Sequence, residues 1–127
     1  ANEFVAGFLG SPKMNFFART ITEVSKDKTK AKFSGGGLDT KLVRLVSTEK
    51  TKDTQARLGI RPQHLRLDNK GPLAGRVTLV ERLGTETIVE LVNKEDTPFR
   101  FASPEVPELT IGQDARFSFD ADHAHLF

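Results

Sequence analysis

The sequence of 127 residues contains no cysteine, no tryptophan and no tyrosine, and it has a single methionine. The lack of cysteine excludes disulfide bridges and every metal site built on thiolate ligands. No apolar run approaches the roughly 18 residues that a membrane-spanning helix needs, and the N-terminus lacks a signal-peptide pattern. With 37% hydrophobic and 28% charged residues, the composition predicts one soluble globular domain with its own core.

Motifs for catalysis are missing as well. No Gly-x-x-x-x-Gly-Lys-Ser/Thr segment occurs, which excludes a Walker-type phosphate loop. The Ser-Gly-Gly-Gly segment at residues 34–37 is better explained as a hairpin turn, because no helical segment follows it whose N-terminus could hold a phosphate. No serine lies in a nucleophile elbow, and only His64, His123 and His125 are available as histidine bases. The sequence therefore predicts no catalytic residue and no cofactor bound by this fragment.

A histidine pair near the end of the chain is the one candidate for metal binding. His123 and His125 are close to Asp120 and Asp122, and residues two apart share one face of a strand. Histidines at the frayed end of a chain are more often solvated, however. We therefore expect no metal site.

Lysines and phenylalanines alternate in a way that resembles a surface for stacking nucleic-acid bases. The residues concerned are Lys26, Lys28, Lys30 and Lys32, with Phe16, Phe17 and Phe33 nearby. The phenylalanines fall on the inward phase of their predicted strands, where core packing uses them. We therefore favour a core with a solvated lysine face, and predict no nucleic-acid partner.

Charge is divided unevenly along the chain although the net charge is only +2. Residues 1–70 hold 14 Lys/Arg and 7 Asp/Glu, whereas residues 71–127 hold 5 and 10. This division could seat a basic surface against an acidic one, within one chain or between two copies. Scattered solvated charge is the simpler interpretation.

Alternation with a period of two dominates the pattern. In residues 28–33 the three lysines face one way and Thr29, Ala31 and Phe33 face the other, as in a half-buried strand. Residues 115–119 alternate in the same way, and residues 76–81 and 87–92 are rich in β-branched side chains. Turns are predicted at 69–72, 94–96 and 111–113, and an exposed loop at 47–56. Many short strands without a helical period predict an all-β antiparallel barrel or sandwich.

Three segments are not explained by packing alone, namely residues 10–16, 58–65 and 80–87. In the second, a strand leads into Pro62, which restricts the backbone so that Arg61 projects from a rigid strand end. We expect Arg61 to pair with Glu81 or Glu86, which flank Gly84. Gly84 itself would permit a bulge or tight turn between two strands. Each segment taken alone is also compatible with a simple turn.

Taken together and in this order, the segments resemble the C-terminal regulatory region of carbohydrate-importer ABC ATPases of the maltose and glycerol-phosphate type. The resemblance begins with Phe-Val-Ala-Gly-Phe-Leu-Gly-Ser-Pro-Lys-Met-Asn-Phe at residues 4–16, which is similar to the linker leaving the ATPase domain. It continues through Leu-Gly-Ile-Arg-Pro at 58–62 and Val-Glu-x-Leu-Gly-x-Glu-Thr at 80–87, and ends with His-Leu-Phe at 125–127. Gln63 stands where the family usually has glutamate, so the salt bridge that the glutamate would make is not expected here, although the amide could keep a hydrogen bond.

The resemblance implies a transport-associated, OB-like antiparallel β-barrel over residues 18–127. Residues 1–17 would form the linker from the absent ATPase domain and the entry to the first strand. It also implies a non-catalytic regulatory and dimerisation domain, with ATP and magnesium bound in the absent ATPase domain. The implied partners are a second copy, the ATPase domain, the membrane subunits of the transporter and a cytoplasmic regulatory protein. Such a domain would lie in the cytoplasm, at the inner face of a bacterial membrane. The contact candidates are Lys13, Met14, Asn15, Phe16, Arg61, Pro62, Gln63, His64, Glu81 and Glu86.

Two other functions are compatible with a small β-barrel. Related barrels in oxyanion importers bind molybdate-like anions, and Arg61, Ser11 and turn amides could form such a nest here. A nucleic-acid-binding barrel is the third hypothesis. Binding to phosphates would show a steep dependence on salt.

Overall fold

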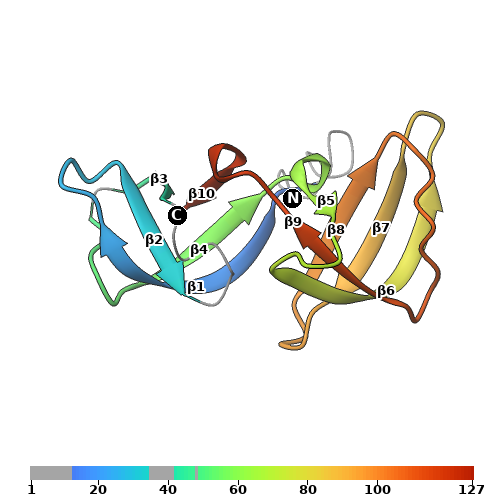
Figure 1. The fold of residues 1–127 in the computed structure, drawn as a ribbon, viewed down its shortest axis with the longest axis horizontal. Helices are drawn as coiled ribbons and strands as arrows, with labels where there is room; N and C mark the ends of the chain where they lie inside the picture. The colour runs from blue at the N-terminus through green and yellow to red at the C-terminus, as the bar shows by residue number, and fades with distance from the viewer. Residues whose placement is uncertain (1–12, 35–41, 48) are drawn as a thin grey trace, which may run out of the picture.

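The computed structural model describes residues 13–34, 42–47 and 49–127. The described residues form ten strands and two short 3-10 helices, arranged in two sheets that lie side by side (Figure 1). Most of the predicted linker and the glycines at 35–37 lie outside the described residues. The all-β prediction is confirmed, and the strands expected in one barrel divide between these two sheets.

The first sheet is a closed barrel with the strand order β1-β2-β3-β10-β4. Its members are β1 (Asn15–Val24), β2 (Lys30–Ser34), β3 (Val43–Leu45), β4 (Gln55–Ile60) and β10 (Ala124–Leu126). The C-terminal strand β10 pairs parallel with β3 and antiparallel with β4, and so completes the barrel. The expectation of a frayed end is therefore wrong, because Leu126 is fully buried. Of the two histidines expected to be solvated, His123 is exposed, whereas the Nδ1 atom of His125 is shielded from solvent.

The second sheet is open and has the order β5-β9-β6-β7-β8. Its members are β5 (Arg66–Leu67), β6 (Leu73–Arg82), β7 (Thr87–Val92), β8 (Pro98–Ser103) and β9 (Asp114–Ser118). All of its pairings are antiparallel, and the register of β6 against β7 shifts between Val77 and Leu79. The irregularity thus lies inside β6, away from Gly84. Gly84 has no positive φ, so the turn there does not require glycine.

The predicted alternation of buried and exposed residues is confirmed in both sheets. Ala31 and Phe33 of β2 are fully buried, whereas Lys30 is exposed and Lys32 is half-buried. Thr29, which was predicted to face inward with them, is exposed because it lies in the turn before β2. In β9 and just beyond, Ala115, Phe117 and Phe119 are buried in the same way. Turns form at the predicted places 69–72, 94–96 and 111–113. The predicted loop at 47–56 is shorter, because β4 already begins at Gln55.

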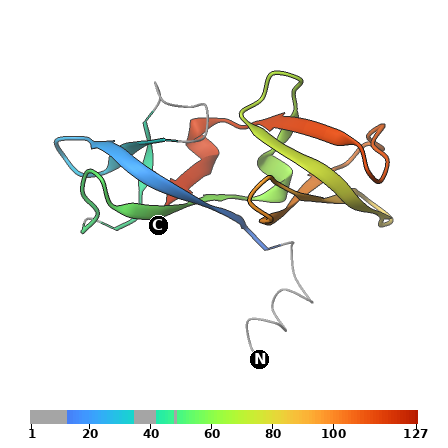
Figure 2. The ribbon, with the colours of Figure 1, turned by 90° about the horizontal axis from the view of Figure 1, so that it is seen from below.

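One continuous core joins the two sheets. Phe17 of β1 meets the ring of Phe99 of β8 edge to face, with centroids 5.4 Å apart, and Phe99 meets Phe117 of β9 at 5.9 Å. The N-terminal end of strand β1 lies toward the second sheet, and the strand runs from there into the barrel (Figure 2), which brings Phe17 to this position. Such aromatic pairs bury large areas, so they tie the barrel to the open sheet.

The chain passes between the sheets twice in its described part, each time through a 3-10 turn. The first, η1 (Pro62–His64), follows β4, and the second, η2 (Ala121–His123), precedes β10. Both coils lie between the sheets in Figure 1. Among the residues that the structure describes, no helix has the length and apolar character needed to cross a membrane.

Candidate functional site

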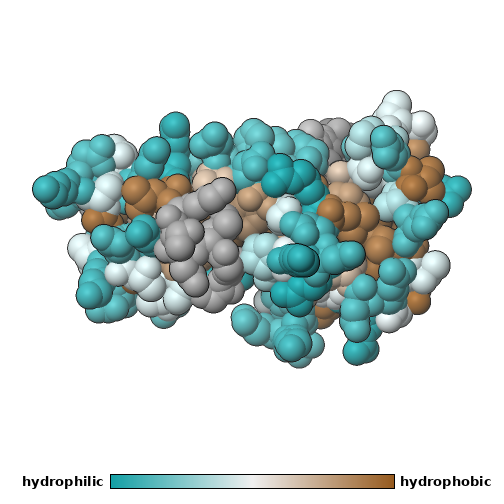
Figure 3. All heavy atoms as spheres, viewed as in Figure 1, coloured by the Kyte–Doolittle hydropathy of each residue, from teal (hydrophilic) through white to brown (hydrophobic). Residues whose placement is uncertain are grey.

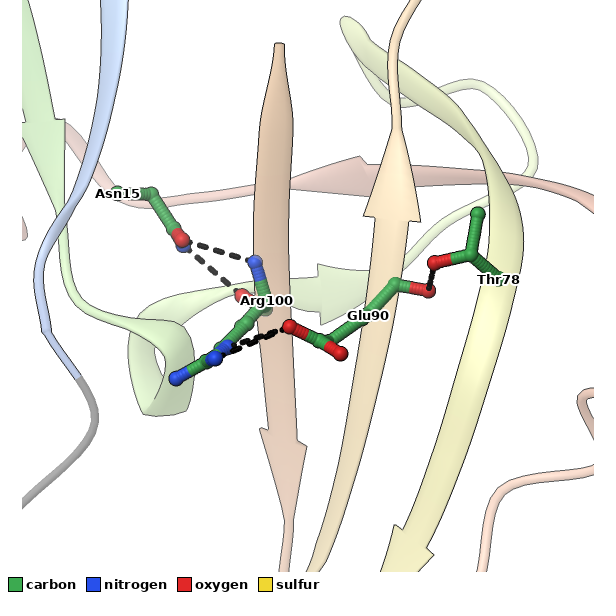
Figure 4. Close-up of polar contacts among 4 residues, drawn as sticks. All are labelled: Asn15, Thr78, Glu90 and Arg100. Atoms are coloured by element: carbon green, nitrogen blue, oxygen red, sulfur yellow. Dashed lines mark hydrogen bonds and ion pairs between the residues drawn. The ribbon is translucent and has the colours of Figure 1, made fainter. Parts of the chain in front are cut away.

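The side chain of Asn15 fastens the barrel to the edge of the second sheet. Its Nδ2 donates to the carbonyl of Arg100, and the backbone N–H of Arg100 donates to its Oδ1, both at 2.8 Å (Figure 4). Asn15 therefore takes the place of a neighbouring strand at one residue of β8. Only 5% of Asn15 is exposed, so its amide is engaged within the chain rather than offered to a partner.

Polar contacts on the sheet surface hold Arg100 in place. Its Nε donates to Oε1 of Glu90 at 3.1 Å, and its Nη2 lies 3.0 Å from the same oxygen. Glu90 belongs to β7, and its backbone carbonyl accepts a hydrogen bond from the Thr78 hydroxyl at 3.2 Å (Figure 4). Thr78 lies where the β6 register shifts. The contact of Asn15 thus continues across three strands of the open sheet.

A buried arginine provides a second link along β1. Arg19 is 9% exposed, its guanidinium lies 5.5 Å from the centroid of the Phe17 ring, and its Nη1 donates to the carbonyl of Ala18 at 2.7 Å. Burial lowers the pKa of Arg19, and the negative charge of Glu95, in the loop between β7 and β8, partly offsets this. Electrostatic attraction therefore also joins β1 to the second sheet.

The predicted Arg-Pro corner forms where β4 ends. Pro62 is the first residue of η1 and is buried, whereas Arg61 and Gln63 on either side are exposed. The ring of His64, at the end of η1, stacks on the ring of His123 in η2, with centroids 4.1 Å apart and planes inclined by 14°. The two turns are therefore in direct contact.

An ion pair lies beside this stack. Arg66 Nη1 is 3.0 Å from both carboxylate oxygens of Asp120. Both side chains are more than half exposed, so the pair stabilises weakly. The pKa of His64 is lowered by burial, then by the neighbouring His123 and by the positive charge of Arg61. The neutral ring is therefore the favoured form in the stack.

The predicted pairing of Arg61 with Glu81 or Glu86 is wrong. No hydrogen bond or ion pair joins these three residues, all of which lie in the described part of the chain. Glu81 and Glu86 flank the turn between β6 and β7, which closes through the bond from Leu83 N–H to the Glu86 carbonyl at 2.8 Å. Backbone hydrogen bonding, rather than a salt bridge, holds that corner.

The outer face of β1, β4 and β10 carries an aromatic cluster, which we call the Phe16 face; it consists of Met14, Phe16, Arg57, Gly59 and Phe127. The Arg57 guanidinium lies 4.4 Å from the centroid of the Phe16 ring, and Phe127 meets the same ring edge to face at 5.6 Å. A Cβ atom at Gly59 would lie 2.5 Å from Met14 Sδ and 2.8 Å from Phe127 Cε1, so glycine lets these side chains close over β4.

Phe16 corrects the expectation that all three early phenylalanines point inward. It is 37% exposed, whereas Phe17 and Phe33 are buried as predicted. Adjacent strand residues face opposite ways, so Phe16 and Phe17 cannot share one face. Of the other contact candidates, Lys13 is exposed and Met14 is half-buried. The structure adds Arg57 and Phe127, whose clustering sequence spacing alone does not reveal.

The described residues contain no group of three or more histidine, aspartate or glutamate side chains arranged to hold a metal ion. A groove does exist on the second sheet, lined among others by Arg76, Lys94, Asp96, Glu108 and Arg116. Its mixed charge does not select an anion, and Arg61 is not part of it. Ser11, the other residue proposed for an anion nest, lies outside the described residues.

Comparison with known proteins gives a consistent result. A TOBE domain family model matches residues 58–127. The maltose/maltodextrin import ATP-binding protein MalK of Vibrio cholerae is 36% identical over 129 residues, covering 99% of this chain and 34% of that protein. The sn-glycerol-3-phosphate import ATP-binding protein UgpC of Ruegeria pomeroyi is 35% identical over 131 residues, covering 100% and 33%. The chain thus spans about a third of the length of these curated relatives.

A solved structure supports the fold. The cytoplasmic molybdate-binding protein ModG, with molybdate bound, matches with a TM-score of 0.60 and 17% identity, over 88% of this chain and 94% of that one. At this identity the likeness concerns the OB-like fold alone. The family match over more than half of the chain, together with relatives aligned along its length, shows that this chain belongs to the TOBE domain family and is homologous to the import ATP-binding proteins MalK and UgpC.

Proposed function

We propose that this chain is the regulatory and dimerisation domain of the ATP-binding subunit of a carbohydrate importer. The observation that carries the proposal is its match, along its whole length, to about a third of MalK and UgpC. Their names describe import ATP-binding proteins, yet this chain has no phosphate loop. ATP and magnesium would then be bound by the remaining part of the parent protein. This fragment would be non-catalytic.

The proposed partners follow from that role. The chain would contact a second copy of itself, the ATPase domain of its own parent and, through the parent, the membrane subunits. The complex would lie in the cytoplasm at the inner face of a bacterial membrane. A cytoplasmic regulatory protein is a further proposed partner, and nucleic acid is not.

The Phe16 face is the surface that we propose for self-association. It combines a partly exposed phenylalanine ring with the flat guanidinium of Arg57, and aromatic and arginine side chains are the residues most enriched at interface centres. Asn15 and Pro62, which are buried within the chain, are left out of this surface. Arg61 and Gln63 follow β4 and would extend it.

Sedimentation velocity over a range of concentrations tests the dimer. Phe16→Ser should weaken self-association, whereas Ile111→Ser, at a site 67% exposed on the second sheet, should leave it unchanged. If charge drives association, raising salt to about 1 M should also weaken it, because the screening length falls to roughly 3 Å. Equal weakening by both substitutions, or a monomer at about 1 mM in low salt, would contradict the proposal.

Calorimetry tests the non-catalytic assignment. Titration of the chain with magnesium and ATP should give no saturable heat, because the sequence offers no backbone cradle for phosphates. Saturable binding at micromolar concentration would show that this fragment itself takes part in nucleotide binding.

A further inference from the structure

The two crossovers between barrel and second sheet are held against each other by histidine side chains. The chain leaves the barrel through η1 and returns to it through η2. His64 ends the first turn and His123 ends the second, and their rings stack with centroids 4.1 Å apart. If one sheet changed its orientation relative to the other, these two backbone segments would have to move. The stack therefore lies where it can resist such a change.

The environment of His64 in this stack favours its neutral ring. The Nδ1 atom of His64 is buried and has no hydrogen-bond partner among the described residues. Two charged imidazolium rings at this separation would repel each other, since like charges about 4 Å apart interact strongly even near a surface. Histidine is also the side chain whose ordinary titration lies closest to neutral pH.

We propose that the His64–His123 stack is a proton-sensitive fastener between the two crossovers. With neutral rings, η1 and η2 are held together and the second sheet has one orientation relative to the barrel. When both rings are protonated, the turns separate and the crossover side of the junction loosens. This device is independent of the function proposed above.

Charged groups around the stack have opposite effects on the protonation of its rings. Arg61, at the start of η1, opposes protonation, while Asp122 in η2 carries a negative charge. Arg66 and Asp120 neutralise each other beside the turns. Strand β8, which packs on η1, carries Arg100 paired with Glu90, and β3, which packs on η2, carries Arg44.

The direction of the His64 shift agrees with this geometry. Burial, His123 and Arg61 all lower its pKa from the ordinary 6.5. A histidine whose pKa is lowered by folding stabilises the folded form above about 6.5, and this contribution is lost as pH falls from there toward the lowered value. The junction should therefore loosen below pH 6.5.

Other contacts keep the two sheets attached when the stack opens. The Asn15 amide bonds to the Arg100 backbone and the Phe17–Phe99 ring contact contain no group that titrates in this range. They join β1 to β8, away from the crossover backbone. Opening of the stack thus releases the turns while both sheets remain folded.

The test is an NMR titration of the isotope-labelled chain from about pH 8 to about pH 4.5, a range that brackets ordinary histidine titration. One readout is the Cε1–H shift of each of the three histidines. The other is the exchange protection of the Leu65 and Ala124 amides, whose N–H groups close η1 and η2 by bonding to Pro62 and Ala121.

We expect His64 to titrate below 6.5, with both amides losing protection as it does so. The loss of protection should follow the His64 titration point by point, because both report the same opening equilibrium. His123→Gln should raise the pKa of His64 and abolish the pH-dependent loss. His125→Gln is the matched control and should preserve both effects, because His125 is not in the stack.

The native chain alone can overturn the proposal, so the test does not depend on the variants folding. Salt at about 1 M should raise the apparent pKa of His64 by screening. The proposal is overturned if His64 and His123 titrate independently at ordinary values. It is equally overturned if the Leu65 and Ala124 amides keep their protection after both rings are protonated.

Discussion

The barrel and the second sheet solve the problem of exposed strand edges in different ways. The barrel has no edge, because the last strand of the chain is inserted between β3 and β4. The second sheet ends in β5, which has two residues, and in β8, where the Asn15 side chain covers Arg100. Open edges invite pairing with other chains, and a short strand or a covering side chain prevents it.

Their surfaces differ as well. Residues 13–60, which form most of the barrel, hold 11 Lys/Arg and 5 Asp/Glu, whereas residues 66–118 of the second sheet hold 7 and 9. The charge division seen along the sequence thus separates two structural units. Most of the exposed face in Figure 3 is hydrophilic, and the largest apolar area in that view lies over the second sheet. The exposed large hydrophobic residues of that sheet and its loops are Leu67, Leu79, Leu83, Val106 and Ile111.

The two sheets therefore depend on each other unequally. The barrel is closed by backbone pairing from a terminal strand, but the second sheet needs a barrel residue to cover its edge. Changes in the barrel should therefore also affect the second sheet.

The largest effect is expected from Leu126→Ala in the closing strand. Leu126 is fully buried and pairs with both Leu45 and Leu58, so its truncation leaves a cavity where the barrel closes. The free energy of unfolding should fall by about 2–5 kcal/mol in urea denaturation. Ile111→Ala, at an exposed site, should change it by less than about 0.5 kcal/mol.

The same variant also tests whether the barrel and the second sheet unfold together. Because one core joins both sheets, amides of β7 should lose protection together with those of β4 in the Leu126 variant. A second sheet that stays protected while the barrel unfolds would show two separate folding units.

A matched pair of glycine substitutions tests the packing of the second sheet. A Cβ atom at Gly75 would lie 2.7 Å from Phe99 Cε1 and 3.1 Å from Leu91 Cβ, so Gly75→Ala should cost about 1–3 kcal/mol. Gly84→Ala meets no atom within 4 Å and requires no special φ. It should be neutral or stabilise by up to about 1 kcal/mol, because alanine has fewer unfolded conformations. Thermal or urea unfolding of both variants measures this, and equal costs would refute the packing argument.

The edge cover is tested by Asn15→Ala. This change removes two hydrogen bonds and leaves the Arg100 N–H and carbonyl unpaired. We expect a loss of about 1–2 kcal/mol, in the lower part of the usual range because water can reach an edge strand. Asn15→Asp is the informative companion, since a carboxylate can accept from the Arg100 N–H but cannot donate to its carbonyl. If the alanine variant is as stable as the parent chain, the edge is covered by other groups.

The smallest effect concerns the turn between β1 and β2. The hydroxyl groups of Ser25 and Thr29 and the Thr29 N–H all donate to Asp27 Oδ1, which lowers the pKa of Asp27 to about 2. A carboxyl group shifted in this way stabilises the fold above its ordinary value of 3.8, and that contribution is lost as pH falls toward 2. NMR titration of Asp27 measures the midpoint directly. Thr29→Val should move it back toward 3.8, and an unchanged midpoint would exclude a contribution from the Thr29 hydroxyl.

Local patterns carried much of the fold prediction. Alternation in residues 28–33 and 115–119 predicted the burial of Ala31, Phe33 and Phe117, because side-chain direction in a strand depends only on its own period of two. The end of β4 at Ile60, just before Pro62, was predictable for another local reason, since proline restricts its own backbone. The family resemblance in residues 58–62, 80–87 and 125–127 then indicated the kind of domain.

Contacts between distant residues could not be predicted in this way. Arg61 was predicted to bind Glu81 or Glu86, but no such pair forms. The contact that does form at this turn is between His64 and His123, which are 59 residues apart in the sequence. Asn15 and Arg100 are separated by 85 residues. Phe16 is predicted on the inward phase together with Phe17, yet it is 37% exposed, because only one of two neighbouring strand residues can point inward.

The all-β character, the inward phase of most strand residues and the family of the chain follow from local sequence patterns. The division of the strands into a closed barrel and an open sheet is visible only in the folded chain. The same is true of the closure of the barrel by residues 124–126 and of the contact between two histidines at the crossovers. The two groups of features differ in the sequence distance over which their causes act. Side-chain alternation and proline restriction act within a few residues, whereas strand partners and ring contacts depend on which distant segments bury each other's surfaces.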